Sequence, residues 1–339
     1  MRAIHAKQLV AADRMVEDQV LVYDRRIEKI ESAAEFDFST CESVLETEYL
    51  LPGFIDVHIH GSAGADVMDA TPEAIATIAA AITQSGTTSF LPTTMTMPEE
   101  RICAALEVIR SCRRAQAEAR EYSGARILGA HLEGPFISAA KKGAQAAEYI
   151  QKPNDRWLKH YYDVVKLITM APEEDEGFEM IRRFKAAGIV VSLGHSQADY
   201  ACACSAYEAG ARHITHLFNA MTPLHHRDPG LAGAGLLQDF NVELIADGFH
   251  LHPDIIRLTS RMKREEQLLL VTDCIRAGFM GEGPSELGGQ RVFVEGDHCL
   301  LEDGTIAGSI LRLDRALRNV LKFTGLELPQ VVRMLSLNP

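Results

Sequence analysis

From Pro52 onward the chain alternates short apolar runs with longer amphipathic stretches. The runs have the length and composition of β-strands, and the stretches repeat their apolar residues at helical spacing. Eight strands are predicted, in the segments GFIDVHIH, TTSFLPT, RILGAHLE, VVKLITMAP, GIVVSLGH, ARHITHLF, VELIADG and LLLVTD. Helices are predicted between most of them, at residues 72–85, 98–119, 175–187, 198–209 and 252–265. Eight β/α units over about 250 residues are typical of a (β/α)8 barrel, which is the fold class we expect.

Two other segments depart from this alternation. Residues 1–50 contain short alternating runs broken by charged turns, which predict a small antiparallel β unit. Residues 288–309 predict a hairpin inserted before a last helix at 310–324. The expected organisation is a small β-sandwich-like domain at 1–50 followed by the barrel at 51–339.

Composition narrows the classes of partner. The 339 residues are 47% apolar and 24% charged, as in globular proteins. The chain has 34 basic and 47 acidic residues and a net charge of -13, which argues against nucleic acid or an anionic membrane surface but not against a small bound anion. Seven cysteines without paired CxxC clusters fit a reducing compartment. No apolar run approaches the ~20 residues of a membrane span, so we expect a cytoplasmic protein.

Candidate chemistry begins with the segment PGFIDVHIHG. On a strand, His58 and His60 point to the same side, as a pair of metal ligands does. An isolated His-x-His pair is equally compatible with one satisfied core histidine and one loop residue. The other strand ends decide between these interpretations.

Polar residues that can bind metal close five of the eight apolar runs or follow them directly. Taken singly, each could cap a helix or fill a polar pocket. Because the C-terminal ends of barrel strands meet at one face, imidazoles and carboxylates from several strands converge there. The set consists of His58, His60, Glu133, His195, His216 and Asp273. Its nitrogen and oxygen donors favour zinc or another divalent transition ion.

The chemistry suited to such a site is hydrolysis. A catalytic zinc lowers the pKa of water toward ~7, and a nearby carboxylate must then move protons. Asp273 is the candidate for that role. The sequence has no G-x-S-x-G elbow after a strand, no Walker A motif and no G-x-G-x-x-G after a strand.

Motifs spread over residues 50–339 resemble the amidohydrolase superfamily, and within it a sugar-phosphate deacetylase subgroup. They are LPGFIDVHIHGSAGADVMDA, HLEGPFIS, KKGAQ, SLGHSQA, THLFNAMTPLHHRDPGLAGAGL, ADGFHLHP, LVTDCIRAGFMGEG and LEDGTIAGS. The resemblance implies removal of the acetyl group from N-acetylglucosamine 6-phosphate, giving glucosamine 6-phosphate and acetate. It also implies a homodimer in which one subunit's loop reaches the neighbouring pocket.

The resemblance assigns roles to individual residues. Glu133, His195 and His216 are expected to hold the metal, with Asp273 as general base and acid. The sugar phosphate is expected on Asn219, the Ala220 backbone, Arg227 and His250, with a pocket lined by Ala144, Ile306, Ala307 and Gly308. The planar guanidinium of Arg227 suits phosphate oxygens, although taken alone this residue is equally a solvated loop cation.

Three features of this sequence are informative when it is compared with members of the subgroup. Some members lack the His pair and bind one metal, so His58 and His60 together indicate the two-metal type. Gln145 stands where some members have a His that polarises the acetamide, so a second metal is expected to carry more of that task. The chain stops at SLNP, where relatives continue into strands that complete the small domain. The ligand types accept Zn, Fe, Mn or Co.

Several alternatives stay open at this point. The substrate could be another N-acetyl hexosamine phosphate, such as N-acetylgalactosamine 6-phosphate. A dihydroorotase, a hydantoinase or a base deaminase would share the superfamily chemistry. Dihydroorotase-like sites bridge their metals with a Lys at the end of strand four. Here Lys166 lies at the start of that strand, which disfavours this rival. An inactive barrel that only binds a ligand is disfavoured by retention of every ligand type and Asp273.

Overall fold

A barrel of parallel strands forms the larger part of the protein. The computed structural model describes residues 2–12, 14–119 and 122–339. The barrel strands lie in the order β5 (Phe54–Ile59), β8 (Thr87–Thr94), β10 (Ala130–Glu133), β11 (Val165–Met170), β12 (Val190–Leu193), β13 (His213–Ile214), β14 (Asn241–Ile245) and β15 (Leu268–Val271). A short strand β9 (Arg126–Ile127) also pairs with β8. The predicted (β/α)8 class is confirmed.

The two ends of this sheet meet next to the candidate metal ligands. The Asp273 backbone N–H donates to the His58 carbonyl at 2.8 Å, and the His60 N–H donates to the Cys274 carbonyl at 2.9 Å. These bonds tie the chain after β15 to the end of β5. Closure of the barrel therefore fixes His58, His60 and Asp273 relative to one another.

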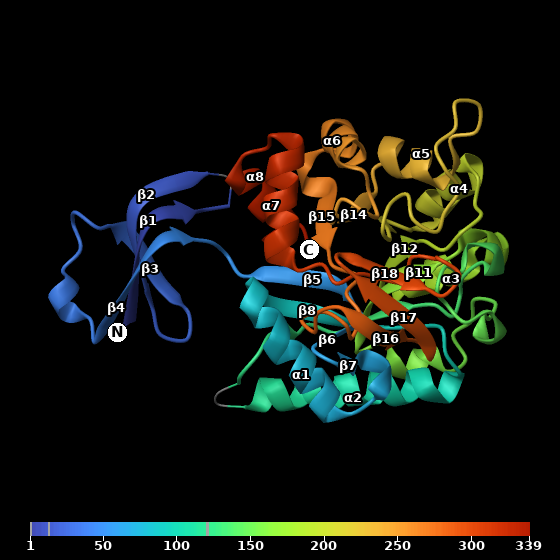
Figure 1. Ribbon diagram of the computed structural model, residues 1–339, viewed down its shortest axis with the longest axis horizontal. Coiled ribbons are helices and arrows are strands. Elements are labelled where there is room, and N and C mark those ends of the chain that lie inside the picture. Colours follow the sequence, from blue (N-terminus) through green and yellow to red (C-terminus); the bar gives the residue numbers. More distant parts are fainter. Residues whose placement is uncertain (1, 13, 120–121) are drawn as a thin grey trace.

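Helices cover the outside of the barrel (Figure 1). They are α1 (Pro72–Ile82), α2 (Glu99–Glu118), α3 (Glu179–Ala186), α4 (Tyr200–Ala209), α5 (Gly230–Leu237), α6 (Pro253–Met262), α7 (Leu313–Thr324) and α8 (Leu328–Ser336). Pro72 opens α1, and the Thr71 hydroxyl accepts the Ala74 N–H at 3.2 Å, as expected of this helix start. Two helices, α5 and α8, were not predicted. The sequence of α5, GLAGAGLL, is almost entirely buried and contains three glycines, so it shows no amphipathic period.

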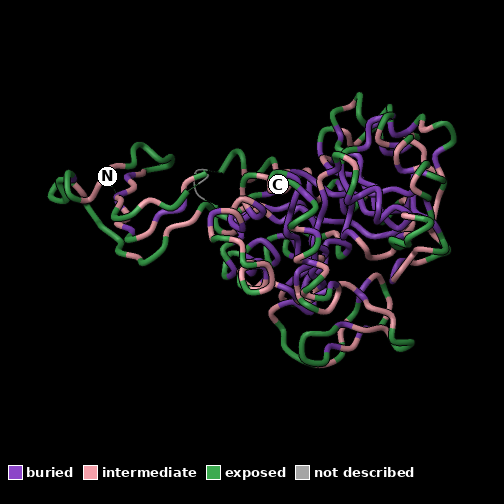
Figure 2. Tube along the Cα trace, turned by 90° about the horizontal axis from the view of Figure 1, so that it is seen from above, coloured by how far each residue is buried: buried purple, intermediate pink, exposed green. Residues whose placement is uncertain are grey.

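The small N-terminal sheet stands to one side of the barrel (Figure 1, Figure 2). Its strands β1 (Arg2–Val10), β2 (Met15–Tyr23), β3 (Ile27–Ser32) and β4 (Ser43–Leu50) lie in the order β3-β2-β1-β4. The prediction of a purely antiparallel unit is wrong, because β4 runs parallel to β1. The connection at 33–42 brings the chain back to the start of β1. Strand β4 begins there and therefore runs in the same direction as β1. Within the described residues the sandwich-like domain is one sheet.

A three-stranded antiparallel sheet lies between β15 and α7. Its strands are β16 (Gly283–Leu287), β17 (Gln290–Glu295) and β18 (His298–Leu301). The insertion therefore starts before the predicted hairpin and has one strand more. Strand β16, GPSEL, was missed because Gly and Pro are typical of turns. Its turn to β17 uses Gly288 and Gly289 at φ 59° and 82°.

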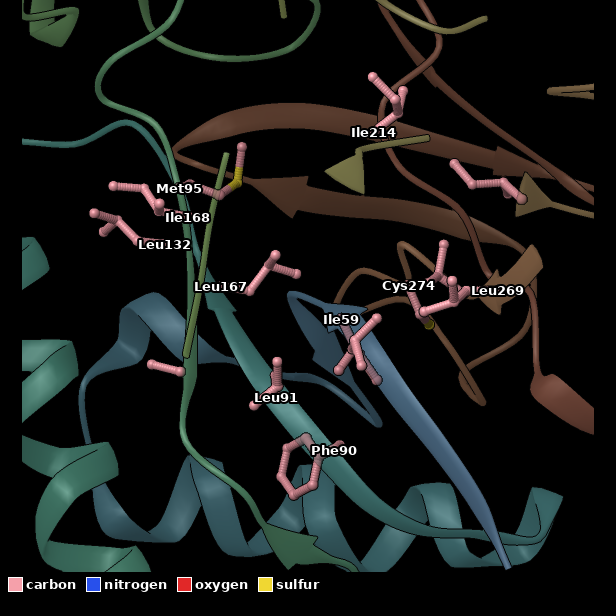
Figure 3. Close-up of a cluster of buried hydrophobic side chains, with 14 of the residues drawn as sticks. Ile59, Phe90, Leu91, Met95, Leu132, Leu167, Ile168, Ile214, Leu269 and Cys274 are labelled. Carbon is pink, nitrogen blue, oxygen red and sulfur yellow. The ribbon is translucent and has the colours of Figure 1, made fainter. Parts of the chain in front are cut away.

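Buried apolar side chains from barrel strands and surrounding helices form one continuous core. Figure 3 shows part of it, with Phe90 of β8 and Ile59 of β5 among the labelled side chains. The small sheet has its own cluster of Ala3, Val20, Val22 and Phe36. Parallel strands buried on both faces leave little freedom to move, so their C-terminal ends form a rigid platform. Among the described residues, no helix has the length and apolar character needed to cross a membrane.

Truncating the core should be costly. Phe90 is fully buried, so Phe90→Ala is expected to lower the free energy of unfolding by about 3–5 kcal/mol through lost burial and a cavity. Phe38→Ala, at a side chain 38% exposed on the small domain, should cost less than about 1 kcal/mol. Urea unfolding followed by circular dichroism measures both. Equal losses would contradict this assignment of the core.

Candidate active site

Six side chains from the ends of five strands meet at the C-terminal end of the barrel. His58 and Glu133 lie within β5 and β10, and the others lie one or two residues beyond their strands. His195, His216 and Asp273 adopt left-handed backbone conformations, with φ of 47°, 31° and 49°. Such conformations are costly for residues with a Cβ and cluster at functional sites. The chain thus turns sharply where each of these side chains must face the barrel axis.

The first group of possible ligands is Glu133, His195 and His216. Glu133 Oε1 lies 3.2 Å from Nε2 of both histidines, and the two Nε2 atoms are 3.1 Å apart. His195 Nδ1 is 2.8 Å from the Lys141 carbonyl, which can only accept, so this ring carries its proton on Nδ1. The Nε2 lone pair of His195 then faces its neighbours. A shared divalent cation accounts for such convergence of lone pairs and a carboxylate.

The second group is His58, His60 and Asp273. His60 Nε2 lies 3.2 Å from both Glu133 Oε2 and Asp273 Oδ1, and its Nδ1 is 3.2 Å from the Thr93 carbonyl. His58 Nε2 lies 3.4 Å from Glu133 Oε1 and 3.5 Å from Asp273 Oδ1. Glu133 therefore contacts both groups of possible ligands.

Electrostatics in this cluster favour a positive charge. Burial lowers the pKa of His60, but hydrogen bonds to Asp273 and Glu133 outweigh this and raise it to about 9. Burial opposes ionisation of Glu133, yet the charges of His58 and His195 hold its pKa well below the usual range. Asp273 behaves similarly, because His58 and His60 overcome the effect of burial and lower its pKa. The surroundings that stabilise protons on imidazoles also suit a divalent cation.

Glu243 of β14 was not predicted from the sequence. It is fully buried, and Oε2 lies 2.9 Å from His58 Nδ1 and accepts the His216 N–H at 3.1 Å. Oε1 lies 3.0 Å from His213 Nε2. The Glu243 carboxylate thus contacts the His58 ring of the second group and the His216 backbone of the first. Partners of metal-binding histidines commonly make such contacts. The available signal was an acidic residue flanked by apolar ones at the start of the run VELIADG.

His131 makes a third grouping with His58 and Glu243. Its Nδ1 lies 3.1 Å from the Val57 carbonyl and its Nε2 lies 2.7 Å from the Thr169 hydroxyl. Burial and, to a lesser extent, the charge of His58 lower its pKa to about 3. Because both ring nitrogens have protein partners, His131 is better explained as a buried structural residue than as a ligand.

A cavity of about 350 Å³ opens onto the cluster. This volume is at the lower end of the range for small-molecule sites. Predicted site residues that line it are His60, Glu133, Ala144, Gln145, His195, His216, Asn219, Ala220, His250, Asp273, Ile306 and Gly308. Lining residues that were not predicted include Met95, Lys141, Leu287 and Thr305.

Three predicted residues do not line this cavity. His58 and Ala307 are fully buried. Arg227 is exposed on the loop after β13, where its guanidinium contacts His226 Nε2 at 2.7 Å. The fold of a single chain therefore does not bring Arg227 to its own cavity.

Gln145 is buried beside the ligand cluster. Its Nε2 donates to Glu133 Oε2 at 2.7 Å, and its Oε1 accepts the Thr96 N–H at 2.7 Å. The neighbouring Ala144 carbonyl accepts from Gln290 of the insertion at 2.5 Å. The loop that carries Gln145 is thus tied to both the ligand cluster and the insertion.

A parallel barrel with His, Glu and Asp ligands at its C-terminal face defines a metal-dependent hydrolase. Residues 49–339 match the amidohydrolase family, and the chain belongs to it, which confirms the family predicted from the motifs. It is 44% identical to the N-acetylglucosamine-6-phosphate deacetylase of Bacillus subtilis (strain 168) over 295 residues, 85% of this chain and 74% of that protein.

Two further proteins extend the comparison. The chain is 37% identical to the N-acetylgalactosamine-6-phosphate deacetylase of Escherichia coli O157:H7, over 87% of this chain and 78% of that one. A mutant N-acetyl-D-glucosamine-6-phosphate deacetylase from Mycobacterium smegmatis, solved in complex with N-acetyl-D-glucosamine-6-phosphate, superposes with a TM-score of 0.89. It is 28% identical, and the match covers 100% of this chain and 89% of that one.

Proposed function

We propose that this protein hydrolyses the acetamide of N-acetylglucosamine 6-phosphate, releasing acetate and glucosamine 6-phosphate. The observation that carries the proposal is the position of Glu133, which contacts two histidine groups beside Asp273 at the floor of the cavity. The name of the Bacillus subtilis relative supports the glucosamine epimer over the galactosamine epimer, because that relative is more similar to this chain than the Escherichia coli one.

We propose two divalent ions, with zinc as the first candidate and Fe, Mn or Co as alternatives. Glu133, His195 and His216 would hold one ion, and His58, His60 and Asp273 would complete a second site through the shared Glu133. Their imidazole and carboxylate donors suit these metals. Bound metal would acidify the attacking water and polarise the acetamide carbonyl.

The residues of the chain supply the remaining steps. Asp273 is held as a carboxylate, so it can take a proton from the attacking water and deliver it to the leaving nitrogen. Gln145 holds Glu133 in place and can donate only a neutral hydrogen bond. Asn219, the Ala220 backbone and His250, which line the cavity, are proposed to bind the phosphate with Arg227.

Arg227 leads us to propose a homodimer. Its exposed position on the loop after β13 suits a side chain that enters the cavity of a second copy. A phosphate dianion needs charged donors, and Lys141 is the one Lys or Arg among the residues that line the described cavity. The seven free cysteines support a cytoplasmic enzyme.

Acetate release tests the proposed function directly. Purified protein with metal should release acetate fastest from N-acetylglucosamine 6-phosphate in a panel that includes the galactosamine epimer and both unphosphorylated sugars. Faster turnover of the galactosamine phosphate would move the proposal to that epimer. No acetate from any member, together with no stoichiometric metal, would indicate a binding protein.

Removing the proton acceptor should slow chemistry without removing metal. Asp273→Asn keeps the shape of the side chain but cannot take a proton, so kcat should fall by at least ~100-fold. Metal content should stay close to that of wild type, measured by mass spectrometry. Asp163→Asn, a matched change at a surface residue paired with Arg110, should leave kcat unchanged. Near-normal turnover in Asp273→Asn would assign the proton transfer to another group.

The histidine pair decides the number of metal ions. The His58→Asn, His60→Asn double variant should drop from two ions per chain toward one, with a large loss of turnover, because two ligands of the second site are gone. A His160→Asn, His252→Asn double variant changes two exposed histidines and should keep both ions. A content of one metal ion per chain in both wild type and the His58, His60 variant would contradict the two-metal proposal.

The phosphate anchor is tested by selectivity. Arg227→Ala should lower kcat/KM for the phosphorylated sugar by about 10-fold or more, the scale of a charge-assisted contact, and change the unphosphorylated sugar little. Arg114→Ala, an exposed arginine on α2, serves as control. Sedimentation should report a dimer for both variants. Equal losses on both sugars would give Arg227 a structural role, and a fully active monomer would contradict the exchange of loops.

A further inference from the structure

The cavity has an apolar wall that neither the candidate metal ligands nor the proposed phosphate contacts explain. Met95 follows β8, Leu287 ends β16, and both line the cavity although each residue is only 2% exposed. Their side chains belong to the same continuous core as the barrel strands. Because so little of either residue is exposed, the space beside them is narrow. It suits a small apolar group better than a hydroxyl or a phosphate, which would lose hydrogen bonds there.

Contacts on both sides of Met95 along the chain hold it next to the ligand cluster. The Thr93 carbonyl lies 3.2 Å from His60 Nδ1. The Thr96 N–H donates to Gln145 Oε1 at 2.7 Å, and the Gln145 amide in turn donates to the ligand cluster. The backbone around Met95 is therefore fixed relative to the place where the proposed hydrolysis occurs.

The insertion packs against the same wall. A Cβ atom added to Gly288 would lie 3.4 Å from Met95 Cε and 3.5 Å from its Sδ, so the turn between β16 and β17 packs on the thioether. In Figure 3 the Met95 side chain reaches toward the strands of the insertion. The bond from Gln290 to the Ala144 carbonyl ties the next strand to the loop after β10. A methionine side chain is flexible, but these neighbours leave it little room to move aside.

Met95 also lies across the barrel from the proposed phosphate site. Strands β10, β11 and β12 separate β8 from β13 on one side of the closed barrel, and β5, β15 and β14 separate them on the other. Asn219 and Ala220 follow β13. A secondary amide is almost always trans, so the methyl group of an acetamide points away from the sugar carbon that carries the nitrogen. With the carbonyl at the ligand cluster between the two sides, the methyl group is directed toward Met95.

We infer that Met95 and Leu287 form the pocket for the acyl group of the substrate and restrict hydrolysis to amides of short acids such as acetic acid. This inference rests on the proposed function and names the residues that select its acyl group. A longer acyl chain would have to displace the thioether or the insertion, and overpacking a well-packed wall is unfavourable. One methylene group that a pocket does not fit changes kcat/KM by about 10- to 200-fold.

A pair of N-acyl substrates tests the size of the pocket. In wild type, kcat/KM for N-acetylglucosamine 6-phosphate should exceed that for the N-butanoyl analogue by about 10-fold or more. Met95→Ala should reduce this preference by about 10-fold or more, because the truncated side chain leaves room for the longer chain. Met97→Ala, the same change at a half-buried methionine that does not line the cavity, should leave the preference unchanged.

Further variants separate an acyl contact from a structural role. Removing the phosphate from the substrate should lower kcat/KM by the same factor in wild type and in Met95→Ala, because Met95 lies on the other side of the barrel. Leu287→Ala changes a different element and should shift the acyl preference in the same direction, so the inference stays testable if Met95→Ala fails to fold. Ile245→Val changes an apolar lining residue at the end of β14 and should not alter the preference.

Each contrary result has a distinct meaning. Equal kcat/KM for the acetyl and butanoyl substrates in wild type would overturn the acyl pocket and leave the proposed function standing. Equal losses on both substrates in Met95→Ala would give Met95 a structural role, and a loss confined to phosphorylated sugars would place it at the phosphate. A preference that changes only with Ile245→Val would move the acyl pocket to β14. If wild type releases no acetate from any hexosamine phosphate, the proposed function itself fails, and the acyl pocket with it.

Discussion

The contact of the Glu133 carboxylate with four imidazoles is the constraint on which the site depends. Its two oxygens lie 3.2–3.4 Å from Nε2 atoms contributed by β5 and by the turns after β12 and β13. A buried carboxylate and buried imidazoles at this spacing require compensating charge, and any shift of one strand would leave a charged group without a partner. The barrel must therefore be closed and well packed before the site can exist.

Backbone strain and buried hydrogen bonds show how the fold meets that requirement. His195, His216 and Asp273 each occupy a left-handed conformation directly after a strand. Glu243 then accepts from the His216 backbone and holds His58 by its far nitrogen. The core supplies the rigidity and these contacts supply the direction. The ligand atoms consequently point to the barrel axis, and Lys141 and Gln145 of the loop after β10 help to hold His195 and Glu133 there.

The spacing of apolar residues and the residue types were enough to predict the strands that carry the candidate ligands. Each apolar run ended close to a polar residue, and the runs had lengths that only strands satisfy. The helix α5 was missed because nearly all of its residues are buried, and β16 was missed because its Gly and Pro resemble a turn. The parallel pairing of β4 depends on a contact with β1 that is distant in sequence, which local pattern does not contain.

The candidate site was predictable to the extent that its residues follow strands. Glu243 was not predicted, because its role arises from partners on other segments. The exposed position of Arg227 likewise depends on where its loop lies, which residue type alone does not reveal. Sequence indicated which side chains have suitable chemistry, and the fold determined which of them meet.

The insertion of β16, β17 and β18 has an evolutionary consequence. Leu287 of β16 lines the cavity, and Gln290 of β17 holds the loop of Ala144, yet the insertion contributes neither a candidate metal ligand nor the proposed general base. A mutation in these strands can reshape the space around the sugar while the hydrolytic centre keeps its geometry. New substrates could thus be acquired by drift in this one segment, with the ancestral chemistry inherited intact.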